Sequence, residues 1–295
     1  MVQYHCKALS ARVGHPVTLL EGSRELGGRV VHESALPGLA AWRRVADHRQ
    51  QQLALLEKVE VYRESPTTAQ DVLDFGFEHV VVATGARWRA DGVGRHSTRA
   101  LPVADGCDVL TPDDLFAGRR PAGRSVVLYD DDHYYLGGVL AELLTAEGFA
   151  VTLVTPAPLA SAWTANTLEV GRIQARLLRS GVTLRPSRAL TAVAPGEVRT
   201  ACVFTGDADS TQADGVVTVT ARLPRAEVAG ELLAARDRWA AAGVRSVTAI
   251  GDCLAPSTIA AAVHAGHRYA RELGEPPAGD VPFRRELTAL SPDFP

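Results

Sequence analysis

Glycines placed near an acidic residue are the clearest chemical signal in this sequence. Glu21 follows a short apolar run, and in dinucleotide-binding folds an acidic residue at the end of the second strand accepts hydrogen bonds from an adenosine ribose. The stretch Leu26-Gly27-Gly28-Arg29 begins five residues further on. A glycine pair lets backbone pass close to a pyrophosphate, although glycine is also the default residue of an ordinary turn. We take Glu21, Gly27, Gly28 and Arg29 as candidate ligands of an adenine nucleotide.

Two later turns place small residues where a strand leaves the sheet. Thr84 and Gly85 follow an apolar strand, so that no large side chain blocks a nucleotide crevice there. Gly251 would permit close approach of a ligand, and Asp252 can accept a hydrogen bond from a ribityl hydroxyl. The helix that follows would favour negative charge at its N-terminus. Each turn alone is compatible with a structural role, but all four features in this order predict a nucleotide site.

No residue pattern in the chain indicates a catalyst or a metal site. We find no Ser/His/Asp triad and no paired-carboxylate signature. His264 and His267 fall three apart on the last helix, where packing or capping is favoured over metal binding because further ligands are missing. The cysteines are too widely spaced for a redox-active Cys-x-x-Cys, a zinc ribbon or an iron–sulfur cluster. We expect buried or half-buried free thiols at Cys6, Cys107, Cys202 and Cys253.

The elements that must position these residues alternate between strand and helix patterns, which is typical of β-α-β units and a mainly parallel sheet. We expect strands at residues 17–20, 59–62, 79–84, 125–129, 150–155, 182–185 and 246–250. We expect helices at residues 40–58, 67–75, 136–147, 167–180, 225–242 and 257–273. Residues 86–124 have the pattern of a crossover between domains, and residues 189–220 that of an antiparallel excursion. The predicted fold class is α/β.

Length and composition exclude several classes of protein. A chain of 295 residues with 46% hydrophobic and 22% charged side chains is typical of a globular protein with one or two domains. The net charge of -3 gives no electrostatic attraction to nucleic acid. No apolar run reaches the roughly 18 residues of a spanning helix, and the first residues do not have the pattern of a signal peptide. We therefore expect no nucleic-acid or membrane partner and a cytoplasmic location.

Motifs spread over nearly the whole chain resemble one flavoprotein family. Besides Glu21 and Leu26-Gly-Gly28, they are Ser34-Ala-Leu-Pro-Gly-Leu39 with Trp42, Ala83-Thr-Gly-Ala-Arg-Trp88, Leu110-Thr-Pro112, Ala249-Ile-Gly-Asp252, Ala255-Pro256 and Gly266-His-Arg-Tyr-Ala-Arg-Glu272. They resemble the C-terminal half of the family that contains trimethylamine, dimethylamine and histamine dehydrogenases and 2,4-dienoyl-CoA reductase. The stretches Ala-Thr-Gly-Ala-Arg-Trp and Gly-His-Arg look more like the amine dehydrogenases than the reductases.

The resemblance implies two Rossmann-like nucleotide folds, an FAD-type fold split by an inserted NAD-type fold. It implies an FAD-like first part at residues 1–110, the inserted NAD-like domain at 111–222, the second FAD-like part at 223–275 and a tail at 276–295. In the reductases this region holds FAD and NADPH. In the amine dehydrogenases it holds only ADP, and electrons leave for an electron-transfer flavoprotein. The implied cofactor of this chain is therefore FAD or ADP.

The family's catalytic half is not encoded in this sequence. Its substrate chemistry takes place in an N-terminal (β/α)8 barrel with FMN, which alone needs roughly 250 residues. A cysteine motif for a 4Fe–4S cluster follows that barrel in the family, and the cysteine spacing here excludes it. We expect no iron–sulfur cluster in this chain. A catalytic FMN/4Fe–4S subunit or an electron-transfer flavoprotein is the expected partner.

Both glycine-rich turns of the family are altered. Counting back from Val17, the sequence starts at about the last glycine of the first Gly-x-Gly-x-x-Gly turn, and residues 1–5 contain no glycine. In the second turn the glycines are replaced by Asp130, Asp131 and Asp132. Each carboxylate would oppose a pyrophosphate by about 1 kcal/mol at contact even in water, so NAD(P) is not expected to bind. We interpret the three aspartates as a solvated turn and not as a metal site, because consecutive residues do not converge as ligands.

Two functions of different classes follow from these observations. The first is an adenine-nucleotide (ADP or FAD) binding module of an amine-dehydrogenase-like flavoprotein oxidoreductase without its catalytic half. The second is a non-binding structural or interaction remnant, or a gene fragment, of the same family. A self-contained two-domain disulfide reductase is excluded by the two altered glycine turns and the missing Cys-x-x-Cys.

Overall fold

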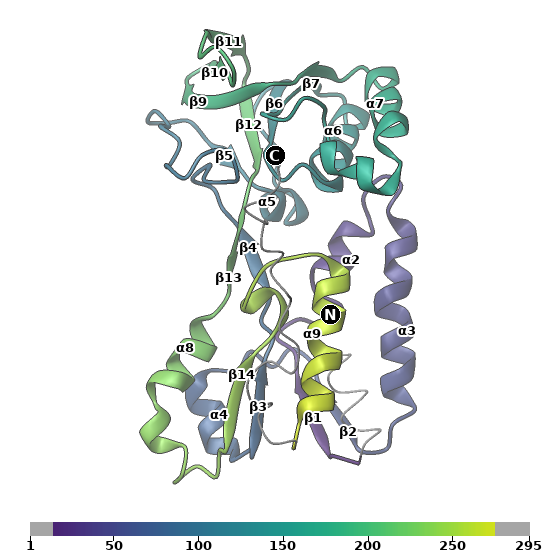
Figure 1. Ribbon diagram of the computed structural model, residues 1–295, viewed down its shortest axis with the longest axis vertical. Helices are drawn as coiled ribbons and strands as arrows, with labels where there is room; N and C mark the ends of the chain where they lie inside the picture. Colours follow the sequence, from purple (N-terminus) through teal and green to yellow (C-terminus); the bar gives the residue numbers. More distant parts are fainter. Residues whose placement is uncertain (1–13, 275–295) are drawn as a thin grey trace, which may run out of the picture.

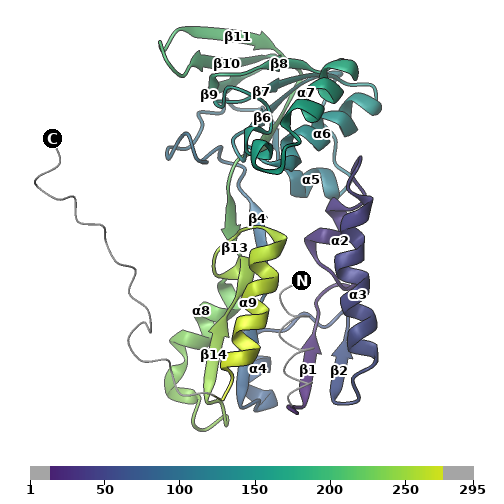
Figure 2. The same ribbon diagram turned by 45° about the vertical axis from the view of Figure 1, so that its right-hand side comes forward.

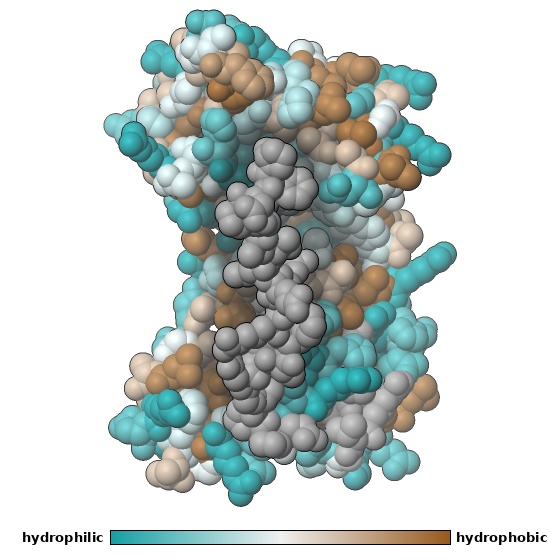
Figure 3. Space-filling model, in the orientation of Figure 1, coloured by the Kyte–Doolittle hydropathy of each residue, from teal (hydrophilic) through white to brown (hydrophobic). Residues whose placement is uncertain are grey.

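The computed structural model describes residues 14–274, which form two lobes joined by a narrow waist (Figures 1 and 2). The upper lobe holds the sheet and helices between residues 109 and 219. The lower lobe combines the elements before residue 83 with those after residue 226. Hydrophilic and hydrophobic side chains are mixed over both lobes in Figure 3. The prediction of an α/β protein with parallel sheet is confirmed.

The upper lobe is built on an all-parallel sheet of order β5-β12-β6-β7-β8. Its strands are β5 (Val109–Leu110), β6 (Ser125–Asp130), β7 (Ala150–Val154), β8 (Thr183–Arg185) and β12 (Gly215–Val219). Consecutive apolar residues such as Val127 and Leu128 of β6 are buried on both faces of the sheet, as covered parallel strands require. The helices are α5 (Pro112–Phe116), α6 (Tyr135–Ala146) and α7 (Val170–Arg179). Leu140 and Leu144 of α6 are fully buried, each contributing about 2 kcal/mol by burial.

A three-stranded antiparallel sheet projects from the upper lobe. It contains β9 (Arg188–Ala194), β10 (Glu197–Cys202) and β11 (Ala208–Gln212), in the order β11-β10-β9. The predicted antiparallel excursion is therefore confirmed for these strands. It was wrong for residues 215–219, because β12 leaves the excursion and pairs in parallel between β5 and β6. All five residues of β12 are buried, so its sequence lacks the alternation that marks an exposed hairpin strand.

The strands of the lower lobe form two separate parallel pairs among the described residues. β1 (Val17–Leu20) pairs with β2 (Val59–Tyr62), and β3 (His79–Val82) pairs with β14 (Ser246–Ala249). The helices are α2 (Arg29–Glu33), α3 (Arg43–Ala54), α4 (Ala69–Phe75), α8 (Glu227–Ala234) and α9 (Ile259–Glu272). Within this lobe β3, α4 and α8 share a core that includes Val80, Val82 and Leu232.

The helix predicted at 67–75 is α4, which begins after Thr68, and Thr68 forms a reciprocal capping box with Asp71. Thr111 and Asp114 form the same box at α5. The predicted helix at 40–58 is a short 3₁₀ turn, Ala40–Trp42, followed by α3, which ends before Leu55. Of these helices, α4 and α5 begin directly after a capping threonine, whereas the 3₁₀ turn and α3 have no side-chain cap.

The lobes are connected by two antiparallel strands, β4 (Ala86–Trp88) and β13 (Arg222–Pro224). β4 lies in the predicted crossover at residues 86–124, and β13 begins where the inserted domain is predicted to end, at residue 222. The domain limits themselves stay a prediction. In residues 14–274 no helix is long and apolar enough to cross a bilayer. The two connecting strands bring α2, α5 and the turn after β14 together at the waist (Figure 1).

Candidate functional site

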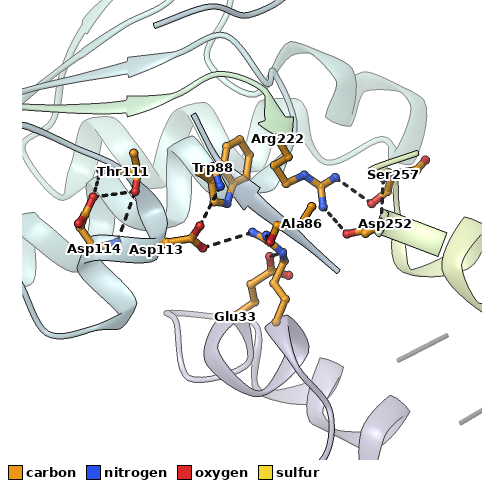
Figure 4. A network of polar contacts seen from close by, with 10 residues as sticks. Glu33, Ala86, Trp88, Thr111, Asp113, Asp114, Arg222, Asp252 and Ser257 are labelled. Carbon is orange, nitrogen blue, oxygen red and sulfur yellow. Dashed lines mark hydrogen bonds and ion pairs between the residues drawn. The ribbon is translucent and has the colours of Figure 1, made fainter. Parts of the chain in front are cut away.

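The waist contains a network of charged and aromatic side chains drawn from five elements (Figure 4). Arg29 starts α2 and Glu33 ends it, Trp88 ends β4, Asp113 lies on α5 and Arg222 starts β13. The sixth member, Asp252, lies in the 3₁₀ turn Gly251–Cys253 that follows β14. Because these residues come from chain segments far apart in sequence, only the folded chain assembles the network.

Arg29 crosses the waist from the lower lobe to β4. Its Nη2 donates to the carbonyl oxygen of Ala86 at 3.1 Å, and its guanidinium lies 3.8 Å from Glu33 and 4.0 Å from Asp113. Its Nη1 is buried and has no hydrogen-bond partner. Burial lowers the pKa of Arg29, and the nearby Arg222 acts in the same direction, whereas Glu33 opposes the shift.

Two guanidinium groups lie close to the ring of Trp88. The carbons at the centres of the Arg29 and Arg222 guanidiniums are each 5.5 Å from the centroid of its ring. Its backbone N–H donates to Asp113 at 2.8 Å, which ties β4 to α5. Each cation–π contact of this kind contributes about 0.5–2 kcal/mol, more where the cation is desolvated. The indole therefore holds two like charges close together at the junction of the lobes.

Asp252 is held by a second set of contacts. One carboxylate oxygen accepts from Arg222 Nη1 at 2.8 Å, and the other accepts from the backbone N–H of Ser257 at 3.0 Å. Arg222 Nη2 also donates to the carbonyl of Ser257 at 2.9 Å. Both oxygens of Asp252 are consequently engaged by the protein itself.

Glu33 is a carboxyl group of the network whose pKa is raised. Its side chain is almost completely buried, and burial raises its pKa to about 7. Arg29 and Arg222 lower that pKa, and Asp252 and Asp132 raise it, by smaller amounts. Glu33 thus changes its charge near neutral pH at the contact between the lobes.

Of the predicted site residues, Arg29 and Asp252 are brought together in this network through Arg222. Gly27 is buried with φ of +130°, and a side chain there would meet Val31 and Ala46, so this glycine serves the packing of α2 on α3. Gly28 has φ of +55° and is exposed, with open space where a side chain would stand. The two glycines therefore have different roles.

The remaining predicted residues lie on separate turns. Glu21 follows β1 and accepts from the backbone N–H of Ser23 at 2.9 Å. The Thr84 hydroxyl donates to the carbonyl oxygen of Arg225, and Gly85 accepts from the Arg225 N–H at 2.9 Å. Gly251 has φ of +65° and opens the turn that carries Asp252. A role of these residues in nucleotide binding stays a prediction.

Sequence reasoning did not select Glu33, Asp113 or Arg222 as site residues. Trp88 was noticed only as part of a motif. Asp113 has a signal in the sequence, because it follows the Thr111-Pro112 start of a capped helix. Arg222 has none, since nothing in its neighbourhood indicates that it meets a carboxylate thirty residues away in sequence.

The acidic turn after β6 corrects one expectation. Asp130 and Asp131 are completely buried and are not part of a solvated turn. The Asp131 carboxylate accepts from the backbone N–H of His96 at 2.9 Å and lies 3.2 Å from His133 Nε2. The sequence could not predict this burial, because the His96 N–H comes from a loop more than thirty residues earlier.

The cysteines within the described residues are free thiols, as the sequence predicts. Cys107 and Cys202 are half-buried, Cys253 is buried, and all three are free. Cys6 lies outside the described residues. Between residues 14 and 274 no group of three or more histidine, cysteine or acidic side chains is arranged to hold a metal ion.

Known proteins match this chain along almost its whole length. Residues 110–219 match the family model of the OYE-like second alpha/beta domain. Dimethylamine dehydrogenase of Hyphomicrobium sp. (strain x) is 31% identical, over 98% of this chain and 43% of that protein. The structure of histamine dehydrogenase from Rhizobium sp. 4-9 has 47% identity and a TM-score of 0.94, over 98% of this chain and 45% of that chain.

A third relative is the 6-hydroxypseudooxynicotine amine oxidase of Pseudomonas geniculata N1. It has 38% identity and a TM-score of 0.89, over 92% of this chain and 40% of that chain. The chain thus spans less than half the length of each of these relatives. It matches the dimethylamine and histamine dehydrogenase family, as a partial, C-terminal region of such proteins.

Proposed function

We propose that this chain is the adenine-nucleotide-binding module of an amine-dehydrogenase-like flavoprotein oxidoreductase. In this proposal the two lobes are nucleotide folds, the upper one inserted into the lower one between β4 and β13. The nucleotide is ADP, or the ADP half of FAD, and it lies in the lower lobe. The bound nucleotide has a structural role in this proposal. The described residues provide it with hydrogen bonds and charge, and none of them is arranged as a catalyst.

One observation carries the proposal. Gly28 and Gly85 both have positive φ, and no atom lies within 4 Å of where a side chain would stand on either. The hydrogen bond from Arg29 to the carbonyl of Ala86 joins the residues next to these two glycines. Two open backbone turns therefore lie within reach of one arginine side chain, an arrangement that suits a phosphate group approached by backbone and guanidinium.

The contacts of Asp252 favour ADP over FAD. A ribityl hydroxyl would have to share Asp252 with Arg222 and Ser257, each of which already donates to one of its oxygens. Arg29, Trp88 and Arg222 pack against one another beside it. We therefore propose that the residues present suit the adenosine diphosphate part better than the ribityl chain.

Ligand-induced thermal stabilisation tests the proposal. ADP should raise the unfolding temperature of the wild-type protein more than FAD does, because a ligand that binds only the folded state shifts the equilibrium towards it. Gly28→Asn, which places a side chain in the open turn, should abolish the effect. Gly106→Asn is the matched control, since Gly106 also has positive φ and open space but lies in the loop before β5.

The alternative is a scaffold that binds no nucleotide. It is favoured by the internal pairing of Asp252 and of the Thr84 hydroxyl, because a ligand would have to share these groups with their present partners. Wild-type protein that gains no stability from either ADP or FAD would support this alternative and refute the binding function.

The electron-transfer partner is also part of the proposal. The chain covers under half of its dehydrogenase relatives, so a catalytic FMN/4Fe–4S part or an electron-transfer flavoprotein would supply the redox chemistry. We further expect a cytoplasmic protein.

A further inference from the structure

The turn between β6 and α6 lies where a parallel α/β sheet binds its ligands. The chain runs from β6 to β7 and β8 on one side, whereas β12 lies on the other side of β6. The order of strands therefore reverses at β6, and in open α/β sheets ligands bind outside the carboxyl ends of the strands at this switch point. Phosphates are held there by the N-terminus of the helix that follows the first strand.

In this chain the switch point holds a buried carboxylate. Asp130 is the last residue of β6 and is completely buried. Its Oδ1 accepts from the backbone N–H groups of Asp132 at 3.2 Å and His133 at 3.1 Å. The backbone N–H of Ser161, on the loop after β7, also donates to this carboxylate.

The carboxylate is directed at the first turn of α6, a helix of twelve residues. A Cβ added to Gly137 would lie 2.5 Å from the Asp130 carboxyl carbon and 2.7 Å from its Oδ2, so the absent side chain of Gly137 makes room for the carboxylate. No side chain caps this helix, and its first turn contains no acidic residue. Oδ2 of Asp130 has no hydrogen-bond partner and is fully buried against that turn.

The charge of Asp130 is set by opposing effects. Burial and the neighbouring Asp132 raise its pKa to about 6, whereas His133 and the backbone donors lower it. The group is therefore ionised above this pH, as an anion enclosed by amides from two loops and by the start of a helix.

We propose that the Asp130 carboxylate replaces a bound phosphate in the β6–α6 turn. It occupies the position at the start of α6 where a dinucleotide-binding fold holds the phosphate of its ligand. The turn is then closed to pyridine nucleotides because it is already filled, and not only because its charge repels them. Removing the side chain leaves a vacancy that accepts a small carboxylate anion. This inference concerns the upper lobe and is independent of nucleotide binding in the lower lobe.

Chemical rescue tests the proposal. Asp130→Gly removes the CH2COO⁻ group, which corresponds to acetate. The unfolding temperature of the variant is therefore measured at pH 7.5 with increasing sodium acetate, and separately with sodium chloride of equal ionic strength. At acetate ten times above its dissociation constant, the folding equilibrium of the variant should shift about tenfold, a rise of about 3 °C in unfolding temperature. Wild-type protein should show no difference between the two salts.

Asp132→Gly is the matched control in the same turn. The Asp132 carboxylate is partly exposed and lies 3.5 Å from Arg95, outside the enclosed position. Acetate should therefore not stabilise this variant. The proposal is overturned if acetate stabilises wild type, Asp130→Gly and Asp132→Gly equally. It is also overturned if Asp130→Gly folds and acetate does not stabilise it.

Two further measurements cover the remaining outcomes. Asp130→Gly could be unfolded in chloride, and recovery of its fold in acetate would then support the proposal. The second variant is Asp130→Ala, whose missing group corresponds to formate. The proposal is refuted if acetate does not restore Asp130→Gly and formate does not restore Asp130→Ala. NADH is also titrated into wild-type protein that has been saturated with ADP. No binding is expected, and binding that excess ADP does not displace would show that the turn is open.

Discussion

Arg222 is the residue on which the waist depends most, because it contacts three different elements. It pairs with Asp252, donates to the Ser257 carbonyl and stacks on Trp88. The Arg222 and Asp252 side chains are only 15% and 19% exposed, so their attraction is screened less than that of a surface pair. Removing one partner would leave a charge poorly solvated.

We predict that Arg222→Met lowers the free energy of unfolding by about 2 kcal/mol or more, since Asp252 loses its partner while the apolar stem is largely kept. In a double-mutant cycle with Asp252→Asn, the two changes should be non-additive by about 1–3 kcal/mol. Urea unfolding followed by circular dichroism measures both quantities.

The control is Arg87→Met, which breaks the exposed 2.7 Å pair between Arg87 and Glu227. It should cost less than about 1 kcal/mol. Equal losses for Arg222→Met and Arg87→Met would mean that the waist pair stabilises the fold no more than a surface pair does.

Glu33 leads to a prediction about pH. Its folded pKa of about 7 lies above the value of 4.5 for a free glutamate, so the folded state binds the proton more tightly. The stabilisation is complete below pH 4.5 and is lost as pH rises through 7, by about 3 kcal/mol in total. The charges that face it are Arg29, Arg222, Asp252 and Asp132.

Glu33→Gln should remove this dependence, because glutamine does not titrate. The free energy of unfolding of the variant relative to wild type should therefore increase by about 3 kcal/mol between pH 4.5 and pH 8. Urea titrations of both proteins at the two pH values test this. Parallel pH profiles would show that the buried carboxyl does not titrate as proposed.

At the scale of elements, the pattern of apolar residues predicted the strands, but the pattern of charged residues did not predict which side chains are buried. Val80 and Val82, in a run of valines, predicted β3, because a strand covered on both faces carries consecutive apolar residues. Asp130 and Asp131 indicated a solvated turn yet are buried, because Gly137 and Gly94 leave room for their carboxylates. Such fitting between distant segments is invisible in local sequence.

The turn before α2 gives a further prediction. A methyl group on Gly27 would lie 2.6 Å from Val31 and 3.2 Å from Ala46, in a backbone conformation with φ of +130° that other residues rarely adopt. Gly27→Ala should therefore cost about 2 kcal/mol or more. Thermal and urea unfolding of the variant measure this loss.

Gly171 serves as the control for this glycine. It lies in α7 with no atom within 4 Å of the position of a side chain, so Gly171→Ala should be neutral or stabilise the protein by up to about 1 kcal/mol. If Gly27→Ala is as stable as wild type, α2 and α3 can move apart at this glycine without a loss in the free energy of unfolding.

At the scale of the whole molecule, the sequence predicted the fold class and the family but only part of the waist. Arg29 and Asp252 were identified from glycine-rich turns. Their partners Arg222 and Asp113 belong to strands and helices that meet only when the two lobes pack. No local pattern marked Arg222, and the helix start that contains Asp113 did not indicate which residues Asp113 would contact. The chain spans less than half the length of each of these relatives, and a redox partner outside it stays part of the proposal.

The central claim is that the lower lobe binds an adenine nucleotide. Isothermal titration of ADP into the wild-type protein measures this most directly. The account predicts saturable binding of one ADP per chain, which is lost in Gly28→Asn and kept in Gly106→Asn. No saturable heat at about 1 mM ADP, where even weak sites of about 4 kcal/mol are half filled, would contradict it.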